Sequence, residues 1–204
     1  MIGIIDYGLG NIKAFANVYE RLKVPCKTVK SKSDFTNVSK IILPGVGAFD
    51  HAMIKLNNSG LKDYLEDLVS LKKMPVLGIC VGMQILANSS DEGDLPGLGW
   101  IDGNVKKFDI NDIPFKTKLP HMGWNNISLN KQNLLMKGLN QNSKFYFLHS
   151  YYFSCKDKSN ALSSSFYGKE FTSAVNHKNV YGVQFHPEKS HHNGVTILNN
   201  FSLL

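Results

Sequence analysis

The sequence predicts an α/β fold, with a mixed, mainly parallel central sheet flanked by helices and a small antiparallel segment in the second half. In the first half, short apolar runs alternate with amphipathic segments, which is typical of parallel strands joined by helices. After about Gly97, short segments are separated by turns rich in Asn, Ser and Gly, which indicates antiparallel or mixed strands. No internal repeat or low-complexity linker interrupts the 204 residues, so we expect a single domain over residues 1–204.

The first half contains four expected strands and two expected helices. The first helix runs from about Asn11, a suitable N-cap, to Leu22, and the second follows the apolar pattern over residues 61–68. Pro75 precedes the last of these strands. The expected strands are Ile2–Ile5, Cys26–Val29, Lys40–Leu43 and Val76–Cys80, and the apolar face of the first helix comprises Ile12, Phe15, Ala16, Tyr19 and Leu22.

The second half is expected to add strands and one closing helix. The strands are Gly103–Phe108, Lys144–Ser150, Phe171–Val175 and Tyr181–Phe185. The closing helix, Val195–Phe201, would pack Val195, Leu198 and Phe201 inward.

Composition excludes several classes of function. The net charge is +7, but 22 of the 23 basic residues are Lys, spread along the chain without a basic block, and Arg21 is the exception. Specific phosphate and base contacts favour arginine, so we expect no nucleic-acid partner, although attraction of an anionic substrate or acidic partner surface stays open. We expect no membrane segment and no signal peptide, because no apolar run is long enough and the chain opens directly into a strand. Three scattered cysteines, Cys26, Cys80 and Cys155, indicate reduced thiols in a cytoplasmic protein.

The strongest chemical signal is Cys80, which has a glycine on each side at a spacing of two. An apolar strand ending in Gly-x-Cys-x-Gly is the thiol form of a nucleophile elbow, the tight turn that exposes a nucleophile above the edge of a sheet. A helix N-terminus and a neighbouring imidazole both favour the thiolate, which is the reactive form. The sequence therefore predicts Cys80 as a nucleophile.

Residues 186–188 supply the remaining parts of a catalytic triad. His186 ends an apolar strand and precedes a proline, which favours an extended backbone and a held ring, and Glu188 could orient that ring. The N–H of Val81 and a second donor from Val46 or Gly47 would form an oxyanion hole. Because ligands of parallel sheets lie beyond the carboxyl ends of the strands, we expect these segments to converge on one cleft.

Two weaker signals point elsewhere, and we discount both. Gly8-Leu9-Gly10 follows a strand as in a dinucleotide fingerprint, but Lys13 occupies the third glycine position and no acidic residue follows at the required place. His191-His192 and the distant cysteines lack metal-ligand spacing. We therefore expect neither a cofactor nor a metal.

With these residues in place, the chain resembles the class I glutamine amidotransferases of the Cys-His-Glu group, which share a flavodoxin-like α/β architecture. Within that class it is most similar to the glutaminase subunits of bacterial imidazole glycerol phosphate synthases. The resemblance runs essentially end to end, and its markers are Asp6–Asn11, Pro44–Phe49, Leu77–Gln84, Gly97–Gly99, Pro120–Asn125, Tyr146–Tyr152 and Gln184–Ser190.

The resemblance implies an activity, a substrate and a partner. Cys80 would attack the carboxamide of glutamine, His186 would deliver a proton to the departing ammonia, and water would hydrolyse the thioester to glutamate. Ammonia would pass into a (β/α)₈ cyclase subunit, which makes imidazole glycerol phosphate and an aminoimidazole carboxamide ribotide in histidine biosynthesis. The glutaminase would be nearly silent until the partner is docked and its ligand bound, with a peptide flip in 44–47 as the natural switch. The positions that match glutamine contacts are Gly47, Gln84, Ser150 and Tyr151, and those that match the surface facing the barrel are Asn11, Trp124 and Asn125.

Two departures from the family pattern keep other interpretations open. The chain has 12–15 Ile-Lys-Ala-Phe where the family commonly places a small residue, and His191 where it usually has Gly. Either could mark a paralogue that supplies ammonia to another acceptor, such as a sugar of a surface polysaccharide. A partner-independent cysteine hydrolase acting on peptides or γ-glutamyl compounds is a further alternative. A non-enzymatic subunit would require a broken triad, and all three residues are present.

Overall fold

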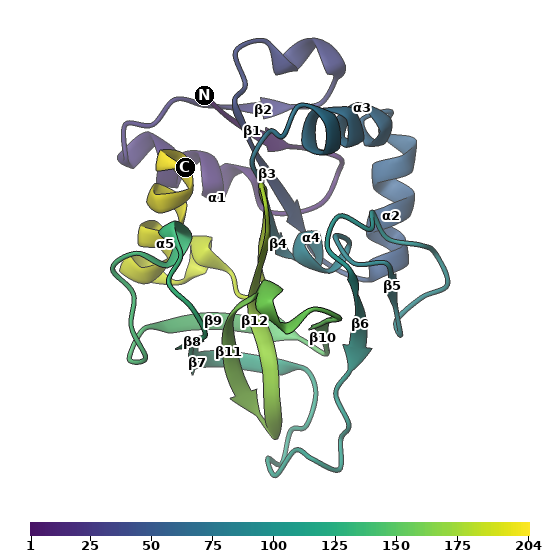
Figure 1. Ribbon diagram of the computed structural model, residues 1–204, viewed down its shortest axis with the longest axis vertical. Helices are drawn as coiled ribbons and strands as arrows, with labels where there is room; N and C mark the ends of the chain where they lie inside the picture. The colour runs from purple at the N-terminus through teal and green to yellow at the C-terminus, as the bar shows by residue number, and fades with distance from the viewer.

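Parallel strands joined by helices form the first half of the molecule in the computed structural model, which describes residues 1–204 (Figure 1). The main sheet has the order β2-β1-β3-β4-β13-β12-β10-β6-β5, with β11 on β12 and β8 on β11, and β7 and β9 form a separate antiparallel pair. The strands are β1 (Ile2–Ile5), β2 (Cys26–Val29), β3 (Lys40–Gly45), β4 (Val76–Cys80), β5 (Ser89–Ser90), β6 (Gly103–Lys107), β7 (His121–Asn126), β8 (Ser128–Leu129), β9 (Lys144–His149), β10 (Tyr151–Cys155), β11 (Ala161–Tyr167), β12 (Lys169–His177) and β13 (Val180–Val183).

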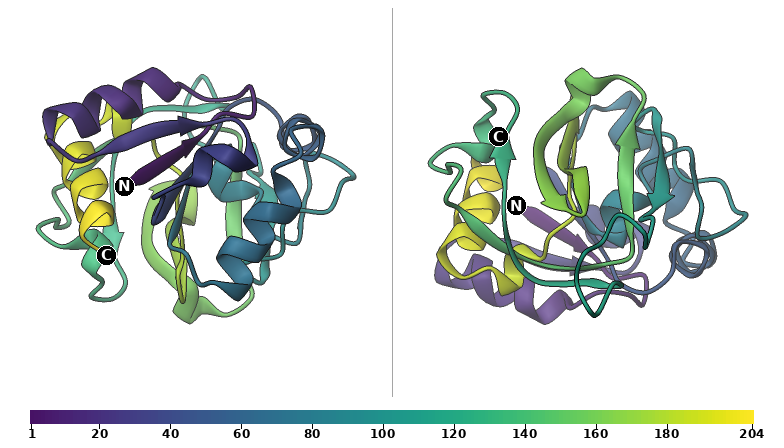
Figure 2. Two further views of the ribbon diagram at one scale, coloured as in Figure 1. Left: turned by 90° about the horizontal axis from the view of Figure 1, so that it is seen from above. Right: turned by 90° about the horizontal axis from the view of Figure 1, so that it is seen from below.

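Helices cover both faces of the parallel part of this sheet. Figures 1 and 2 show α1 and α5 on one side and α2 and α3 on the other, as expected for a sheet whose strands are buried on both faces. The helices are α1 (Ile12–Arg21), α2 (Phe49–Asn58), α3 (Lys62–Glu66), α4 (Val81–Gln84) and α5 (His191–Leu203), with a π-helical turn over Asp67–Leu71 and 3₁₀ turns over Lys32–Phe35, Leu134–Met136, Lys158–Asn160 and Pro187–Lys189.

Helix α1 confirms the predicted helix to within one residue at each end. The Asn11 side chain accepts a hydrogen bond from the Ala14 N–H at 3.2 Å, which caps the helix as expected. Of the predicted apolar face, Phe15 and Tyr19 are fully buried and the other three residues are partly buried against the core. Val18, which we did not place on that face, is buried as well.

Helix α2 is a helix that the sequence analysis did not predict. Its buried residues are Phe49, Ala52, Met53 and Leu56, which follow the i, i+3, i+4, i+7 pattern of an amphipathic helix. This pattern directly follows the glycine-rich segment Pro44–Gly47, which by itself indicates a turn. The second expected helix is present as α3 and continues through the π-helical turn to residue 71.

The second half confirms the predicted change to antiparallel strands. β12 pairs antiparallel with β13, β10 and β11, and β10 with β6. The expected strands at 103–108, 144–150, 171–175 and 181–185 are present with shifted ends, and β5, β7, β8, β10 and β11 are additional. The closing helix is longer than predicted and buries Ile197 besides Leu198 and Phe201, whereas Val195 is only partly buried.

Strand order fixes where a site can form. β3, β4 and β13 are parallel neighbours, so their carboxyl ends lie at the same edge of the sheet.

No helix of the molecule has the length and apolar character needed to cross a membrane.

Candidate active site

Cys80 lies on a sharp turn between strand and helix. It ends β4 with φ 56° and ψ −114°, and α4 starts at the next residue. A non-glycine residue at positive φ costs about 1–3 kcal/mol and persists only where its surroundings impose it. The flanking glycines permit the close packing around this turn, since a Cβ on Gly82 would lie 1.9 Å from the Leu43 carbonyl oxygen and one on Gly78 would lie 2.4 Å from the Gly82 oxygen. The predicted elbow is present.

His186 and Glu188 form a buried pair beside this turn. His186 Nδ1 lies 2.9 Å from Glu188 Oε1, and the two side chains are 5% and 4% exposed. Burial lowers the pKa of His186, but hydrogen bonds with Cys80 and Glu188 outweigh it and raise that pKa to about 10. Because the carboxylate accepts from Nδ1–H, the other ring nitrogen is left for the thiol. Glu188 is therefore not a surface carboxylate paired with Lys189.

The backbone of His186 is bonded to β9 at the point where the chain leaves the main sheet. The His186 N–H donates to the Tyr146 carbonyl at 2.9 Å, and the Tyr146 N–H donates to the Ser190 hydroxyl at 3.0 Å. That hydroxyl in turn donates to the His186 carbonyl at 2.6 Å. Since β13 ends at Val183, these bonds hold the ring where the chain leaves the main sheet.

One cavity of about 330 Å³ unites the predicted site. It contains Cys80 and His186 together with every residue predicted for the oxyanion hole and for glutamine, while Glu188 lies behind the imidazole. Its lining residues are Val46, Gly47, Cys80, Val81, Gln84, Glu92, Pro120, Leu148, His149, Ser150, Tyr151, His186 and Lys189.

Two segments that line this cavity have backbone N–H groups without an acceptor in the chain. Val81 is the first residue of α4, so its N–H has no intrahelical acceptor. Val46 and Gly47 follow β3, and neither N–H donates to another group of the chain. Gly47 has φ +88° with no atom within 4 Å of an added Cβ, so glycine is required there for conformation and not for space.

Gln84 reaches the cavity with its amide nitrogen already engaged. It donates to the Tyr151 carbonyl at 3.0 Å and to Gln184 Oε1 at 3.1 Å. The Gln84 oxygen is the group left to accept from a ligand. Gln184 also donates to Cys80 Sγ, at 3.9 Å.

Glu92 is a cavity residue that the sequence analysis missed. Its Oε2 accepts the Phe49 N–H at 2.9 Å, at the N-terminus of α2. Burial raises the pKa of this carboxyl, the Phe49 N–H lowers it and the nearby Asp50 raises it further, with burial the largest cause. Glu92 belongs to no motif, and only the fold brings it to Cys80.

The residues expected at a partner surface lie on two elements. Trp124 and Asn125 are on β7, where Trp124 is 47% exposed and its ring stacks on His191 with centroids 5.0 Å apart. Met122 and Leu148 are paired across the same two-stranded sheet and are also exposed. Asn11 lies apart from them, as the exposed cap of α1 just beyond β1.

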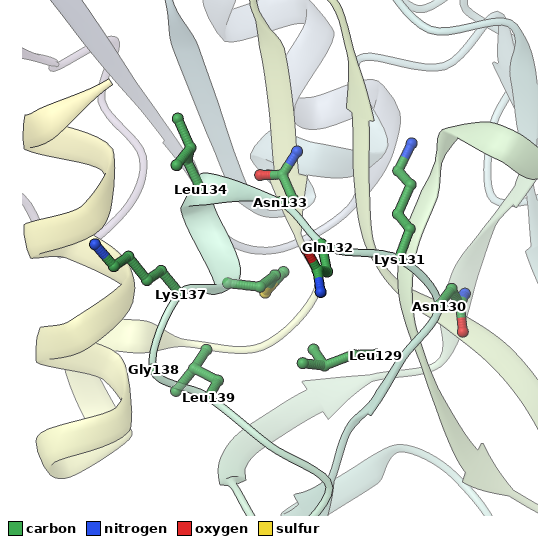
Figure 3. Close-up of a pocket in the computed structure, with 10 residues that line it drawn as sticks. Leu129, Asn130, Lys131, Gln132, Asn133, Leu134, Lys137, Gly138 and Leu139 are labelled. Atoms are coloured by element: carbon green, nitrogen blue, oxygen red, sulfur yellow. The ribbon is translucent and has the colours of Figure 1, made fainter.

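A larger cavity, of about 720 Å³, lies beside α5 (Figure 3). It is lined by residues between Leu129 and Leu139, none of which is a cysteine, histidine or carboxylate. It therefore offers no thiol nucleophile and no imidazole or carboxylate for acid–base catalysis.

Comparison with known proteins decides the family. The model of the family described as glutamine amidotransferase class-I matches residues 3–203. The chain belongs to the class-I glutamine amidotransferases. Two solved structures of low sequence identity share the fold of this amidotransferase. One, described as a glutamine amidotransferase, has a TM-score of 0.75 at 17% identity and covers 100% of this chain and 99% of its own. The other, PurLQS of Thermotoga maritima, has a TM-score of 0.66 at 15% identity and covers 98% and 96%.

Curated relatives of this amidotransferase are similar over their whole length. The imidazole glycerol phosphate synthase subunit HisH of Leptospira borgpetersenii is 54% identical, covering 100% of both chains. The protein of the same name from Bdellovibrio bacteriovorus is 56% identical over 99% of both. Imidazole glycerol phosphate synthase subunit HisH 2 of Pseudomonas aeruginosa is 47% identical over 98% of both.

Proposed function

We propose that this amidotransferase hydrolyses glutamine through Cys80, His186 and Glu188 and delivers the ammonia to a (β/α)₈ cyclase subunit of imidazole glycerol phosphate synthase. The observation that carries the proposal is the single cavity in which the elbow cysteine, the raised-pKa histidine and the free backbone donors meet. The relatives named above are subunits of that synthase, which supports both the partner and the pathway.

The geometry supports a two-step mechanism. The thiolate of Cys80 attacks the side-chain carbonyl carbon of glutamine, and the N–H of Val81 with that of Val46 or Gly47 stabilises the oxyanion, each donor contributing about 10²–10³ in rate. The imidazolium of His186 gives its proton to the leaving nitrogen, so ammonia departs and a glutamyl thioester remains. His186 then takes a proton from water, which attacks the thioester and releases glutamate and the thiolate.

Cavity residues outside the triad orient the substrate. The carboxylate of Glu92 is the acidic group available to pair with the α-ammonium of glutamine. The Gln84 oxygen and the Ser150 and Tyr151 segment would hold the remaining polar groups, as the family resemblance implies.

The partner would dock on the β7–β9 sheet. Exposed Met122, Trp124 and Leu148 form an apolar face on the sheet that also carries the cavity residues 148–149. Asn11 and Asn125 would lie at the edge of that contact.

The alternative acceptor in polysaccharide synthesis receives no support from the relatives, whose names refer to the synthase. Three free cysteines support a cytoplasmic location.

The decisive experiment uses the complex of this chain with its cyclase. Glutamate release should rise strongly when the cyclase and its ribotide ligand are added, and Cys80→Ala should abolish it. The same variant complex should still form product when ammonium salt replaces glutamine, which shows that the partner is intact. Glutaminase activity in Cys80→Ala would overturn the nucleophile. No stimulation by the ribotide would overturn the pathway.

A further inference from the structure

Two buried histidines that the mechanism does not use lie on the face of the β7–β9 sheet opposite to Met122 and Trp124, and one of them, His149, also lines the cavity. His121 of β7 and His149 of β9 are directly paired in register and are 4% and 6% exposed. His121 Nδ1 lies 3.0 Å from His149 Nε2. Aromatic rings pack around them, with Tyr167 stacked on His121 at a centroid distance of 4.1 Å.

The contact of His149 with the backbone fixes its tautomer. His149 Nδ1 lies 2.7 Å from the Tyr151 carbonyl oxygen, which can only accept, so Nδ1 carries the proton. In a neutral ring Nε2 is then an acceptor, and His121 must donate to it from its own Nδ1.

The opposite end of the pair leads to the same assignment independently. The Asn125 amide nitrogen donates to the Phe166 carbonyl at 2.9 Å, and its oxygen accepts the Asn126 N–H at 2.8 Å, so the orientation of the amide is settled. The same nitrogen lies 3.3 Å from His121 Nε2, which must accept. His121 therefore carries its proton on Nδ1, as the other end requires.

Only the neutral form of both rings satisfies every contact. A proton added to His149 would face the Nδ1–H of His121, and one added to His121 would face the Asn125 N–H. Burial lowers the pKa of His121 to about 4, and burial with the adjacent His121 lowers that of His149 to about 3. The other titratable groups that face the pair are His186 and Tyr167, and no carboxylate bonds either ring.

The hydrogen bonds continue from the pair to the nucleophile. The Tyr151 carbonyl that accepts from His149 also accepts from Gln84, which donates to Gln184, which donates to Cys80 Sγ. A continuous series of hydrogen bonds thus joins half-buried Asn125 to the thiol of Cys80. It crosses a peptide carbonyl and two amides, so it fixes positions and does not carry protons.

We propose that His121 and His149 are positioning residues that hold the 150–151 segment of the glutamine cavity and tie it to half-buried Asn125 of β7, the strand whose opposite face carries the docking residues Met122 and Trp124. Contacts made by the partner on β7 then bear on the place of the Tyr151 carbonyl. The inference rests on the proposed function for the meaning of the cavity and the docking face, and the tautomers rest on geometry alone.

The first test is spectroscopic and needs no activity. Long-range ¹H–¹⁵N spectra of the full chain labelled on histidine should show both rings as neutral Nδ1–H tautomers from pH 8 to pH 5. Asn125→Asp removes the donor, so His121 should become an imidazolium that donates to both neighbours. An Nε2–H tautomer on either ring of the wild type, or an unchanged His121 in Asn125→Asp, overturns the assignment.

The second test separates the two bonds of His149 in the complex with the cyclase. His149→Asn keeps a donor near the Nδ1 position, whereas His149→Gln keeps an acceptor near the Nε2 position. Loss of the Tyr151 bond should raise the KM for glutamine in His149→Gln roughly tenfold, with kcat within about threefold. His149→Asn should keep KM within about threefold but lose about tenfold of the stimulation by the partner.

Equal kinetics for the two variants, or wild-type values in both, would remove the positioning role. A cooperative thermal unfolding transition, measured for each variant, is the control that the variant is folded. Failure of the proposed function itself has a different signature, because the wild-type complex would then release no glutamate while the tautomers stay as described.

Discussion

Glu188→Gln tests the part of the triad that depends most on a single hydrogen bond. The exchange preserves the size of the side chain and removes its charge. In the native chain Oε1 accepts from His186 Nδ1 at 2.9 Å, and Oε2 is buried with no partner. In the variant, either the oxygen or the nitrogen of the new amide can face the His186 ring.

The cost of unpaired donors decides that choice. With its oxygen on the ring, the amide would bury two N–H groups where Oε2 lies, and each buried unsatisfied group costs about 1–3 kcal/mol. With its nitrogen on the ring, one N–H is paired, but the imidazole must carry its proton on Nε2. That tautomer cannot take the thiol proton, so the general-base contribution of about 10²–10⁴ is lost. We expect kcat to fall by about 10³.

The pKa of His186 provides a second readout. Glu188 is one of the two groups that raise it to about 10, so the exchange should lower it. Glutamate release by the complex, measured at saturating glutamine from pH 6 to pH 10, gives both kcat and this shift. Glu188→Asp, which keeps the charge, is the matched control and should retain more activity. A loss of less than tenfold at every pH, in a variant that melts like the wild type, would refute the tautomer argument.

The remaining predictions concern stability, the glycines and the docking face. The pKa values of His121 and His149 are lowered to about 4 and about 3, so the folded state is favoured by their neutral forms. The free energy of unfolding should therefore be highest above pH 6.5 and fall as the pH drops below it, by up to about 1.4 kcal/mol per pH unit for each ring. A urea midpoint that is flat from pH 7 to pH 4.5 would contradict this. Gly82→Ala places a Cβ 1.9 Å from a backbone oxygen and should abolish soluble folded protein, a result checked by circular dichroism. Gly47→Ala meets no atom and costs only about 1–2 kcal/mol for its φ of +88°, so it should fold yet lose about 10²–10³ in kcat; full activity would exclude this peptide from the oxyanion hole. His191→Gly relieves a φ of 48° but removes the stack on the β7 tryptophan, so calorimetry should show nearly unchanged melting and weaker binding of the cyclase; an unchanged Kd would leave the stack without a role in docking.

The parts of the site that could be predicted from sequence are those set by local backbone geometry. The Cys80 turn requires glycines at fixed spacing, and Pro187 restricts the preceding His186 to an extended backbone at the end of a strand. Both features can be recognised within a short window of residues. The parallel order of the strands that carry them follows from alternation of strands and helices.

What the sequence did not reveal depends on contacts between distant segments. Glu92 reaches the cavity because its carboxylate caps α2 across the fold, and nothing near residue 92 signals that. The pairing of His121 with His149 depends on the register of two strands 28 positions apart in the chain. A histidine in an apolar strand looks the same in sequence whether its ring is paired, ligating or merely buried.

The bonds between His186 and β9 have a mechanical consequence. Cys80 is rigidly part of the main sheet, while the imidazole is clamped through Ser190 and Tyr146 to the small sheet whose other strand faces outward. The two reacting groups of the site are thus held by different sheets, and the distance between Cys80 Sγ and the His186 ring depends on how the main sheet and the β7–β9 sheet pack together.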